Sequence, residues 1–168
     1  MMKRELIGVL DNVRSRYNVG AIFRTADGLG VTKLYLCGIT PKPDREEDRI
    51  GITKTALGAE ETVPWEGAAE TVDLIRRLKS EGFSVIALET DVSGIPLPDL
   101  ISSPSFKKRG QGRFERIALL VGHEVFGIRR NVLDEADIIT EIPMSGTKRS
   151  LNVEVSFAIG TYALMKSP

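Results

Sequence analysis

The sequence predicts an α/β fold built on a mostly parallel β-sheet that helices cover on both faces. Short apolar runs alternate along the chain with longer segments whose apolar residues recur at helical spacing. Most of the short runs are apolar throughout, as in LIGVL and IALLV, which is typical of strands buried on both faces of a parallel sheet. The length of 168 residues favours one domain with a substantial core.

Five segments are expected to be strands. Three of them are apolar runs with β-branched or large aliphatic residues, at residues 6–10, 83–88 and 117–121. Residues 31–36 alternate apolar and polar side chains, and residues 138–142 (IITEI) end at a proline.

Four segments are expected to be helices: residues 18–27, 65–80, 126–135 and 150 to about 165. The first has apolar residues at three- and four-residue spacing and is followed by two glycines. The second has one apolar face and stops before Gly82, and the last places apolar side chains at i, i+4, i+7, i+11 and i+14.

Three segments between these elements are expected to be less regular. Residues 53–60 suit a short helical turn, while residues 41–48 and 91–116 contain most of the prolines and are expected to be loops. A loop as long as residues 91–116 is usually functional or disordered in a compact domain.

Composition narrows the classes of function. Basic and acidic residues balance at 23 each, so any nucleic-acid binding must come from a local patch. One cysteine, Cys37, and one histidine cannot form an internal disulfide or a His/Cys zinc site. No apolar run reaches the roughly 18 residues of a membrane span, and the first residues lack the apolar core of a secretory signal. We therefore expect a cytoplasmic protein without a metal centre or a membrane segment.

Ligands of an open parallel sheet bind beyond the carboxyl ends of its strands, so the residues after each strand are candidates. After the first strand come Asn12, Arg14, Asn18 and Arg24, with Gly20 in the first turn of the expected helix. The free N–H groups of a helix start, beside arginines, suit a phosphate. A capped helix with solvated arginines explains the same residues, and both interpretations stay open.

The second candidate follows the strand at residues 117–121, where the sequence is GHEVFG. Gly122 at a strand end permits close approach of a ligand, and Glu124 would lie at the rim of the sheet. The alternative is a tight turn into a helix whose positive end favours Glu124. His123, the sole histidine, is expected to be structural rather than catalytic.

The third candidate is the start of the last expected helix, at Ser150, Leu151 and Asn152. Ser150 is a suitable N-cap, and capping alone would explain it. Asn152, inside the expected first turn, would have its amide free to face a ligand or a partner.

Residues 106–116 form a basic segment with five cations, one acid and two interleaved phenylalanines, Phe106 and Phe114. This composition suits an arm that binds an RNA backbone and stacks on its bases, or an ordinary solvated loop. The sequence contains no Gly-rich phosphate loop of the nucleotide-hydrolase type and no Gly-x-Ser-x-Gly nucleophile turn.

Taken together, the three candidates resemble the motifs of the SpoU branch of the SPOUT methyltransferases, also called the TrmH family. The family's N-x-G-x-x-x-R motif is matched by Asn18, Gly20 and Arg24. Its other matches are Gly122, Glu124 and Gly127, the strand end Ile142-Pro143-Met144, the stretch Ser150-Leu151-Asn152-Val153, and KTALGA at residues 54–59. They follow the family order and cover nearly the whole chain.

The resemblance implies a fold and an activity. The implied fold is a single SPOUT methyltransferase domain over residues 1–168, with a C-terminal trefoil knot that forms the S-adenosylmethionine pocket and without the extra N-terminal RNA-binding domain of many relatives. Two subunits of a homodimer would complete the active site. The implied reaction is methyl transfer to a ribose 2′-hydroxyl of RNA, with tRNA expected rather than rRNA. The alternative is a non-catalytic RNA-binding or ligand-binding α/β dimer that kept the fold.

The resemblance also assigns residues. The implied catalytic residues are Asn18, Arg24, Glu124, Ser150 and Asn152; the cofactor contacts are Leu88, Gly122, Ile142 and Leu151; and the RNA contacts are Arg14, Arg16, Lys107, Lys108, Arg109 and Arg113. Because a guanidinium stays protonated in proteins, we expect Arg24 to hold the phosphate and ribose and to stabilise developing oxyanion charge. Asn18 would orient the ribose, and Glu124 would fix Arg24 or Asn18. Residues 153–157 (VEVSF) are bulkier than the family prefers, which would alter the dimer face or the packing.

Overall fold

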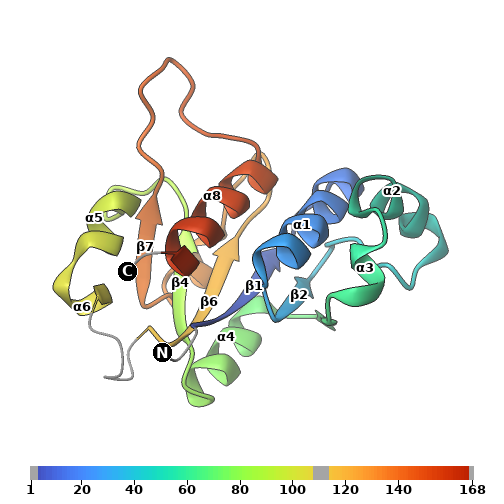
Figure 1. Cartoon of the computed structure of the whole chain (residues 1–168), viewed down its shortest axis with the longest axis horizontal. Coiled ribbons are helices and arrows are strands. Elements are labelled where there is room, and N and C mark those ends of the chain that lie inside the picture. Colours follow the sequence, from blue (N-terminus) through green and yellow to red (C-terminus); the bar gives the residue numbers. More distant parts are fainter. Residues whose placement is uncertain (1–3, 108–113, 167–168) are drawn as a thin grey trace.

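The computed structural model describes residues 4–107 and 114–166. Within them one sheet of seven parallel strands has the order β3-β2-β1-β6-β4-β7-β5 (Figure 1). The strands are β1 Glu5–Asp11, β2 Lys33–Cys37, β3 Trp65–Ala68, β4 Ser84–Leu88, β5 Ile95–Pro96, β6 Arg116–Val121 and β7 Ile138–Glu141. The expected α/β fold with a parallel sheet is confirmed.

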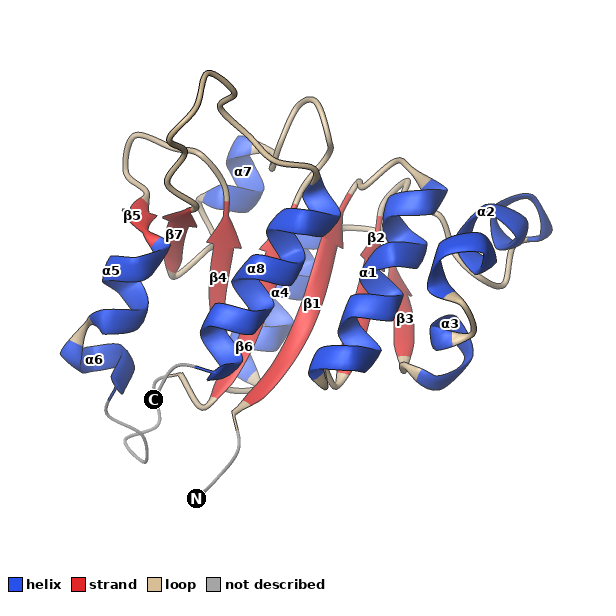
Figure 2. Cartoon of the chain, turned by 45° about the horizontal axis from the view of Figure 1, so that its top comes forward, coloured by secondary structure: helices blue, strands red, loops and turns tan. Residues whose placement is uncertain are grey.

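Helices cover both faces of this sheet (Figure 2). Those of the described chain are α1 Arg16–Leu29, α2 Glu46–Ala56, α3 Ala59–Thr62, α4 Thr71–Ser80, α5 Leu97–Ser102, α6 Pro104–Lys107, α7 Arg130–Leu133 and α8 Val153–Lys166. One buried cluster joins α1, α2, α5 and α8 to the sheet, and a second joins α4 and α7 to the opposite face.

The alternation of side chains along β1 explains why both faces are buried. Leu6 and Leu10 belong to the cluster under α1 and α8, whereas Ile7 and Val9 belong to the cluster over α4. Successive side chains of a strand point to opposite faces, so a strand apolar at every position buries both of them. The apolar runs of the sequence are therefore the central strands of the sheet.

Gly20 fixes how closely α2 packs on α1. A Cβ atom at Gly20 would lie 2.2 Å from the carbonyl oxygen of Ile52 and 2.2 Å from Oγ1 of Thr55. No larger residue fits between the two helices without a shift of the backbone. This glycine of the first motif thus serves helix packing rather than ligand contact.

The expected helix at residues 65–80 was wrong in its first part. Trp65–Ala68 forms strand β3, which pairs with the edge of β2 so that Trp65 lies opposite Leu34. Helix α4 begins only at Thr71. Pro64 keeps the preceding residue extended, and Gly67 disfavours a helix, so the free edge of β2 decides the structure of this segment.

Three further boundaries differ from expectation. The expected loop at residues 41–48 is too long, because α2 begins at Glu46 with three acidic residues in its first turn, which stabilise a helix start. The expected irregular segment 91–116 contains β5, α5 and α6. The expected helix at residues 126–135 shrinks to α7, because Gly127 adopts a left-handed conformation (φ +67°) that interrupts it.

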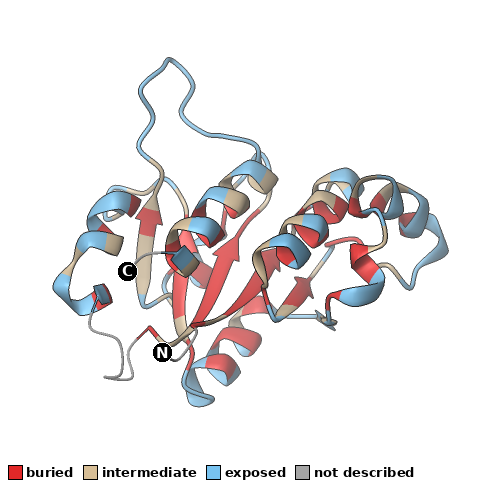
Figure 3. Cartoon of the chain, viewed as in Figure 1, coloured by how far each residue is buried: buried red, intermediate tan, exposed pale blue. Residues whose placement is uncertain are grey.

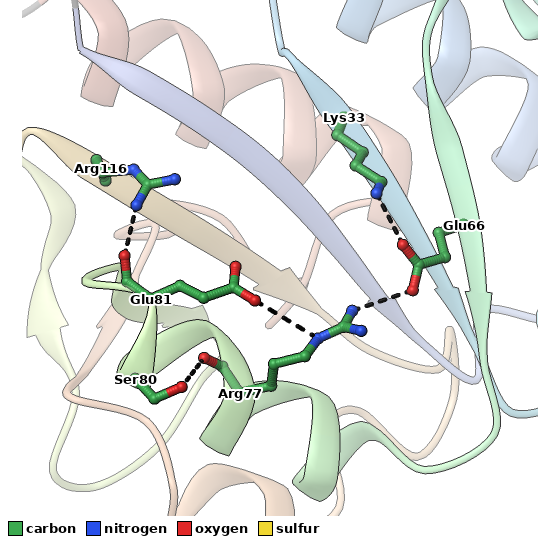
Figure 4. A network of polar contacts seen from close by, with 6 residues as sticks. All are labelled: Lys33, Glu66, Arg77, Ser80, Glu81 and Arg116. Carbon is green, nitrogen blue, oxygen red and sulfur yellow. Dashed lines mark hydrogen bonds and ion pairs between the residues drawn. The ribbon is translucent and has the colours of Figure 1, made fainter.

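On the face of the sheet that α4 covers, a polar network links α4 to strands β2 and β3 (Figure 4). Glu66 accepts from Nζ of Lys33 at 2.8 Å and from Nη2 of Arg77 at 3.1 Å, and these cations hold the pKa of its carboxyl below the ordinary value. Arg116 donates to the backbone carbonyl of Glu81. Exposed ion pairs of this kind contribute about 0–1 kcal/mol each, so the network orients α4 rather than supplying most of its stability.

Candidate active site

The strand order places four loops at one edge of the sheet. The chain runs outward from β1 to β2 and β3, then returns on the other side of β1, where β6 lies between β1 and β4. In an open sheet of parallel strands, the point at which the order reverses leaves a crevice beyond the carboxyl ends. The residues after β1, β6, β4 and β7 meet at this edge.

Glu124 joins the segment after β6 to the start of α1. Its carboxylate accepts from the backbone N–H of Arg14, from the backbone N–H of Ser15 and from Nδ2 of Asn18, each at 2.9 Å. Burial opposes ionisation of this carboxyl, but the three donors outweigh it and leave its pKa below the ordinary value. The expected contact of Glu124 with Asn18 is present, and its contact with Arg24 is not.

The start of α1 is organised by residues other than Asn18. Ser15 is the N-cap, and its Oγ accepts from the backbone N–H of Asn18 at 3.3 Å. Asn12 has a left-handed backbone (φ 57°), and its Oδ1 accepts from the backbone N–H of Ile39 at 3.1 Å. Capping by Ser15 leaves the amide of Asn18 free to bind Glu124, and α1 begins two residues before the expected helix start at residue 18.

The turn after β6 is closely packed around two glycines. A Cβ atom at Gly122 would lie 2.6 Å from the backbone carbon of Gly127 and from the backbone nitrogen of Ile128. Glu89, directly after β4, accepts from the backbone N–H of Ile128 at 2.8 Å and holds this turn from the other side. Glu89 was not predicted from the sequence, although it directly follows the expected strand at residues 83–88. His123 accepts from the N–H of Val125 through Nδ1 at 3.0 Å, a structural role within the turn.

A cavity of about 150 Å³ lies between these loops and the C-terminal segment. All four residues expected to contact the cofactor line it, namely Leu88, Gly122, Ile142 and Leu151. Glu124 and Ser150 also line it, together with Glu89, Glu141 and Arg149. Leu151, just before the last helix, is 36% exposed, yet it lines the same cavity as Gly122, which follows β6. Asn18, Arg24 and Asn152 are not among the lining residues.

The third motif precedes the last helix rather than opening it. α8 begins at Val153, and Asn152 caps it: its Oδ1 accepts from the N–H of Glu154 at 3.1 Å, and its carbonyl accepts from the N–H of Ser156 at 2.9 Å. The expected cap at Ser150 was therefore wrong, because Asn152, two residues further along the chain, fills the N-cap position. Ser150 is left in the cavity wall.

The arginines of the first motif differ in their surroundings. Arg16 is paired through Nε with Oδ1 of Asp48 at 2.7 Å. The side chains of Arg14 and Arg24 are exposed and have no hydrogen bond or ion pair within the described residues. Arg24 lies six residues beyond Asn18, about 9 Å further along α1 at 1.5 Å per residue, and it does not line the cavity of its own chain.

The interpretation of Phe106 and Phe114 as stacking partners for RNA was wrong. Both are buried, at 1% and 6% exposure, and their ring centroids lie 5.2 Å apart in the core. The guanidinium of Arg4 covers the ring of Phe106 at 4.1 Å. Lys107 is exposed in α6, which lies near the amino-terminal ends of the strands in Figure 2, whereas residues after the carboxyl ends of β4, β6 and β7 line the cavity. Lys108, Arg109 and Arg113 lie outside the described residues.

Residues 4–107 and 114–166 contain neither a candidate metal site nor a helix that could span a membrane. Their His, Cys, Asp and Glu side chains form no group of three or more that could hold a metal ion. Among the same residues, no helix is both long and apolar enough to cross a membrane.

The fold and the cavity define an α/β protein with an open cavity at the point where its strand order reverses. Its family follows from comparison: the model of the SpoU rRNA Methylase family matches residues 5–162, and the chain belongs to this family. The family expected from the three motifs is thereby confirmed.

Named relatives carry the same fold. The 23S rRNA (guanosine-2'-O-)-methyltransferase RlmB of Neisseria meningitidis serogroup B is 32% identical over 90% of this chain and 54% of its own length. The AdoMet-bound rRNA methyltransferase of Sinorhizobium meliloti superposes with a TM-score of 0.80 at 26% identity, covering 96% of this chain and 56% of that one. The TrmH/SpoU tRNA modifying enzyme of A. aeolicus gives 0.78 at 25% identity, covering 99% and 78%. The chain spans about half the length of the curated relatives it matches.

Proposed function

We propose that this chain transfers a methyl group from S-adenosylmethionine to a ribose 2′-hydroxyl of RNA. The observation that carries the proposal is the cavity itself. It gathers Leu88, Gly122, Ile142 and Leu151 from four separate segments, beside the Glu124–Asn18 contact, in a member of the SpoU rRNA Methylase family.

The residues of the cavity suit this cofactor. Leu88, Ile142 and Leu151 offer apolar surface for an adenine ring, and Gly122 lets it approach the backbone. The carboxylates of Glu89 and Glu141 are of the right charge for the cationic methionine end. When bound, the cofactor would supply an activated methyl group. Because about 150 Å³ is below the usual range of ligand pockets, we propose that the exposed wall at residues 142–151 moves outward on binding.

The remaining task of the protein is to orient the acceptor. We assign Asn18 to the ribose and Glu124 to holding Asn18 in place. Ser150 and Asn152 organise the facing wall, since Asn152 fixes the start of α8 and Ser150 precedes it in the cavity. Arg24 would hold a phosphate and stabilise the charge that develops on the attacking oxygen.

A homodimer explains how Arg24 reaches a cavity. Leu151, just before α8, and three apolar side chains on one side of α8 are 36–59% exposed; the three are Val155, Ile159 and Tyr162. α8 packs beside α1, the helix that carries Arg24 (Figure 1), so we propose that a partner docked on this side receives Arg24 across the interface. We propose that each active site combines the cavity of one subunit with Arg24 of the other.

The C-terminal segment is proposed to form the trefoil knot that the resemblance implies. α8 follows β7, near the sheet edge, yet it packs over β4 and β6 and against α1. The chain thus returns across the sheet after residues 142–152, which is the path a knotted tail requires.

The first experiment measures cofactor binding by calorimetry and transfer of labelled methyl to RNA. The expected result is binding of S-adenosylmethionine and labelling of RNA purified from cells that lack this gene. Separate tRNA and rRNA fractions decide the target, for which tRNA stays our prediction although several similar proteins are named for 23S rRNA. Binding without transfer to either fraction would instead indicate a non-catalytic binding protein.

Arg24→Ala tests the assignment within this site. It should abolish transfer and leave cofactor affinity within a factor of two of the wild-type value, because Arg24 lies outside the cavity of its own chain. A collapse of cofactor affinity would show that Arg24 holds the cofactor rather than the acceptor.

A further inference from the structure

A second hollow adjoins the cofactor cavity on the side of α1. It measures about 390 Å³ and shares His123, Glu124 and Val125 with that cavity, while Arg14, Arg16 and Tyr17 close its other side. A volume of this size lies in the range that holds a small organic ligand.

Large apolar side chains stand exposed around this hollow. Tyr17 is 53% exposed and Val125 is 78% exposed, and neighbouring Phe126 is 83% exposed. The ring of Phe126 packs on that of His123 with the centroids 4.9 Å apart. A cluster of exposed apolar groups next to a site usually marks a surface that binds a partner or substrate.

The charges beside the hollow identify the class of ligand. Arg14 has a side chain without partners in the described residues, and Arg16 is held in place by Asp48. An aromatic surface flanked by guanidinium groups suits an unstacked nucleobase and its neighbouring phosphates.

We propose that this hollow is the seat of a nucleobase of the RNA substrate, with Tyr17 and Val125 as its base-contacting residues and Arg14 on the adjacent phosphate. The inference rests on the proposed function and adds to it the place where the acceptor strand is held. Glu124 lies between the two hollows, so a base seated here would bring its ribose toward Asn18.

The test uses a fluorescently labelled single-stranded RNA 12-mer of mixed sequence, and binding is followed by anisotropy in low salt. Tyr17→Ala and Val125→Glu should each raise the dissociation constant about 10-fold, whereas Tyr17→Phe, which keeps the ring, should raise it far less. Val92→Glu is the matched control, because Val92 is also an exposed loop valine and lies outside both hollows.

A photo-crosslink locates the RNA independently of any variant. A 12-mer that contains 4-thiouridine should attach to peptides from residues 14–17 or 123–126. Unchanged affinity in Tyr17→Ala and Val125→Glu, with crosslinks elsewhere, overturns the proposal, and so does a wild-type protein that does not bind the RNA.

Two outcomes distinguish a failure of this proposal from a failure of the proposed methyl transfer. If S-adenosylmethionine fails to bind while Tyr17→Ala still weakens RNA binding, the base seat stands and the proposed reaction falls. If Tyr17→Ala converts a dimer to monomers in sedimentation, the surface is a subunit contact and the base seat is overturned.

Discussion

Two of the segments that meet at the carboxyl ends of the strands differ in how many hydrogen bonds hold them. In the segment after β1, residues 11–18, Asn12, Ser15 and Asn18 hold one another or neighbouring loops by hydrogen bonds, and the N–H groups of Arg14 and Ser15 bind Glu124. In the segment after β7, no hydrogen bond or ion pair joins residues 142–151 to the rest of the described chain, and Figure 3 shows most of this loop exposed. One half of the site is therefore preorganised, and a ligand has to order the other half at an entropic cost.

The largest effect expected from this difference comes from one substitution made in two places: the turn after β6, which Glu124 joins to the preorganised segment, and the open loop after β7. Gly122→Ala places a methyl group 2.6 Å from backbone atoms of Gly127 and Ile128, so we expect a loss of about 2–3 kcal/mol in unfolding free energy and of measurable cofactor binding. Gly146→Ala, in the open loop, meets nothing within 4 Å and should change stability by less than about 0.5 kcal/mol. Denaturant unfolding of both variants measures the difference. Equal effects would show that the Gly122 turn is as adaptable as the loop.

Glu124→Gln tests whether the preorganised half depends on one carboxylate. The amide has one acceptor oxygen in place of two, so at least one of the three donors from Arg14, Ser15 and Asn18 loses its partner. We expect a loss of about 1–2 kcal/mol in unfolding free energy, together with a larger fall in methyl transfer than in cofactor affinity. Glu61→Gln is the control, because Glu61 is exposed and has no side-chain partner in the described residues. A Glu124→Gln protein as stable and active as the wild type would leave the contact without a role.

The pH dependence of the same contact has a defined sign. The folded-state pKa of Glu124 lies below its ordinary value of 4.5, so its stabilising effect is complete above that value and is lost as the pH falls through the folded-state pKa. The stability difference between wild type and Glu124→Gln should thus be constant from pH 7 to 6 and shrink toward zero below about pH 4. Urea unfolding at pH 7 and pH 3.5 measures both values. A difference that grows in acid would reverse the assigned sign.

The sequence alone predicted most of the fold, and the reasons for its failures are local. Apolar strands and helical spacing located the central elements, because burial on both faces leaves a pattern in the residues themselves. Trp65–Ala68 could not be predicted as a strand, because the edge of β2 decides it from a distant part of the sequence. The shortened α7 could not be predicted either, because the left-handed turn at Gly127 is held by Glu89, which is also distant in sequence. The residues after β1 and β6 were predicted to share a site, and Glu124 and Asn18 do touch. The buried rings of Phe106 and Phe114 were missed, since a basic loop gives no sign of which aromatic side chains turn inward.

The smallest expected effects come from substitutions of the two polar residues that flank Leu151. Comparing them distinguishes a residue that caps α8 from a residue that contacts the ligand. Asn152→Ala removes the acceptor for the N–H of Glu154 and should lower the unfolding free energy by about 1 kcal/mol. Ser150→Ala removes no hydrogen bond within the described residues and should change stability by less than about 0.5 kcal/mol, although Ser150 lines the cavity. Thermal unfolding and cofactor calorimetry on both variants separate the roles, because a cap changes stability first and a cavity residue changes affinity first. A stability loss in Ser150→Ala equal to that in Asn152→Ala would place the true start of α8 at Ser150 and would remove the open loop from the comparison.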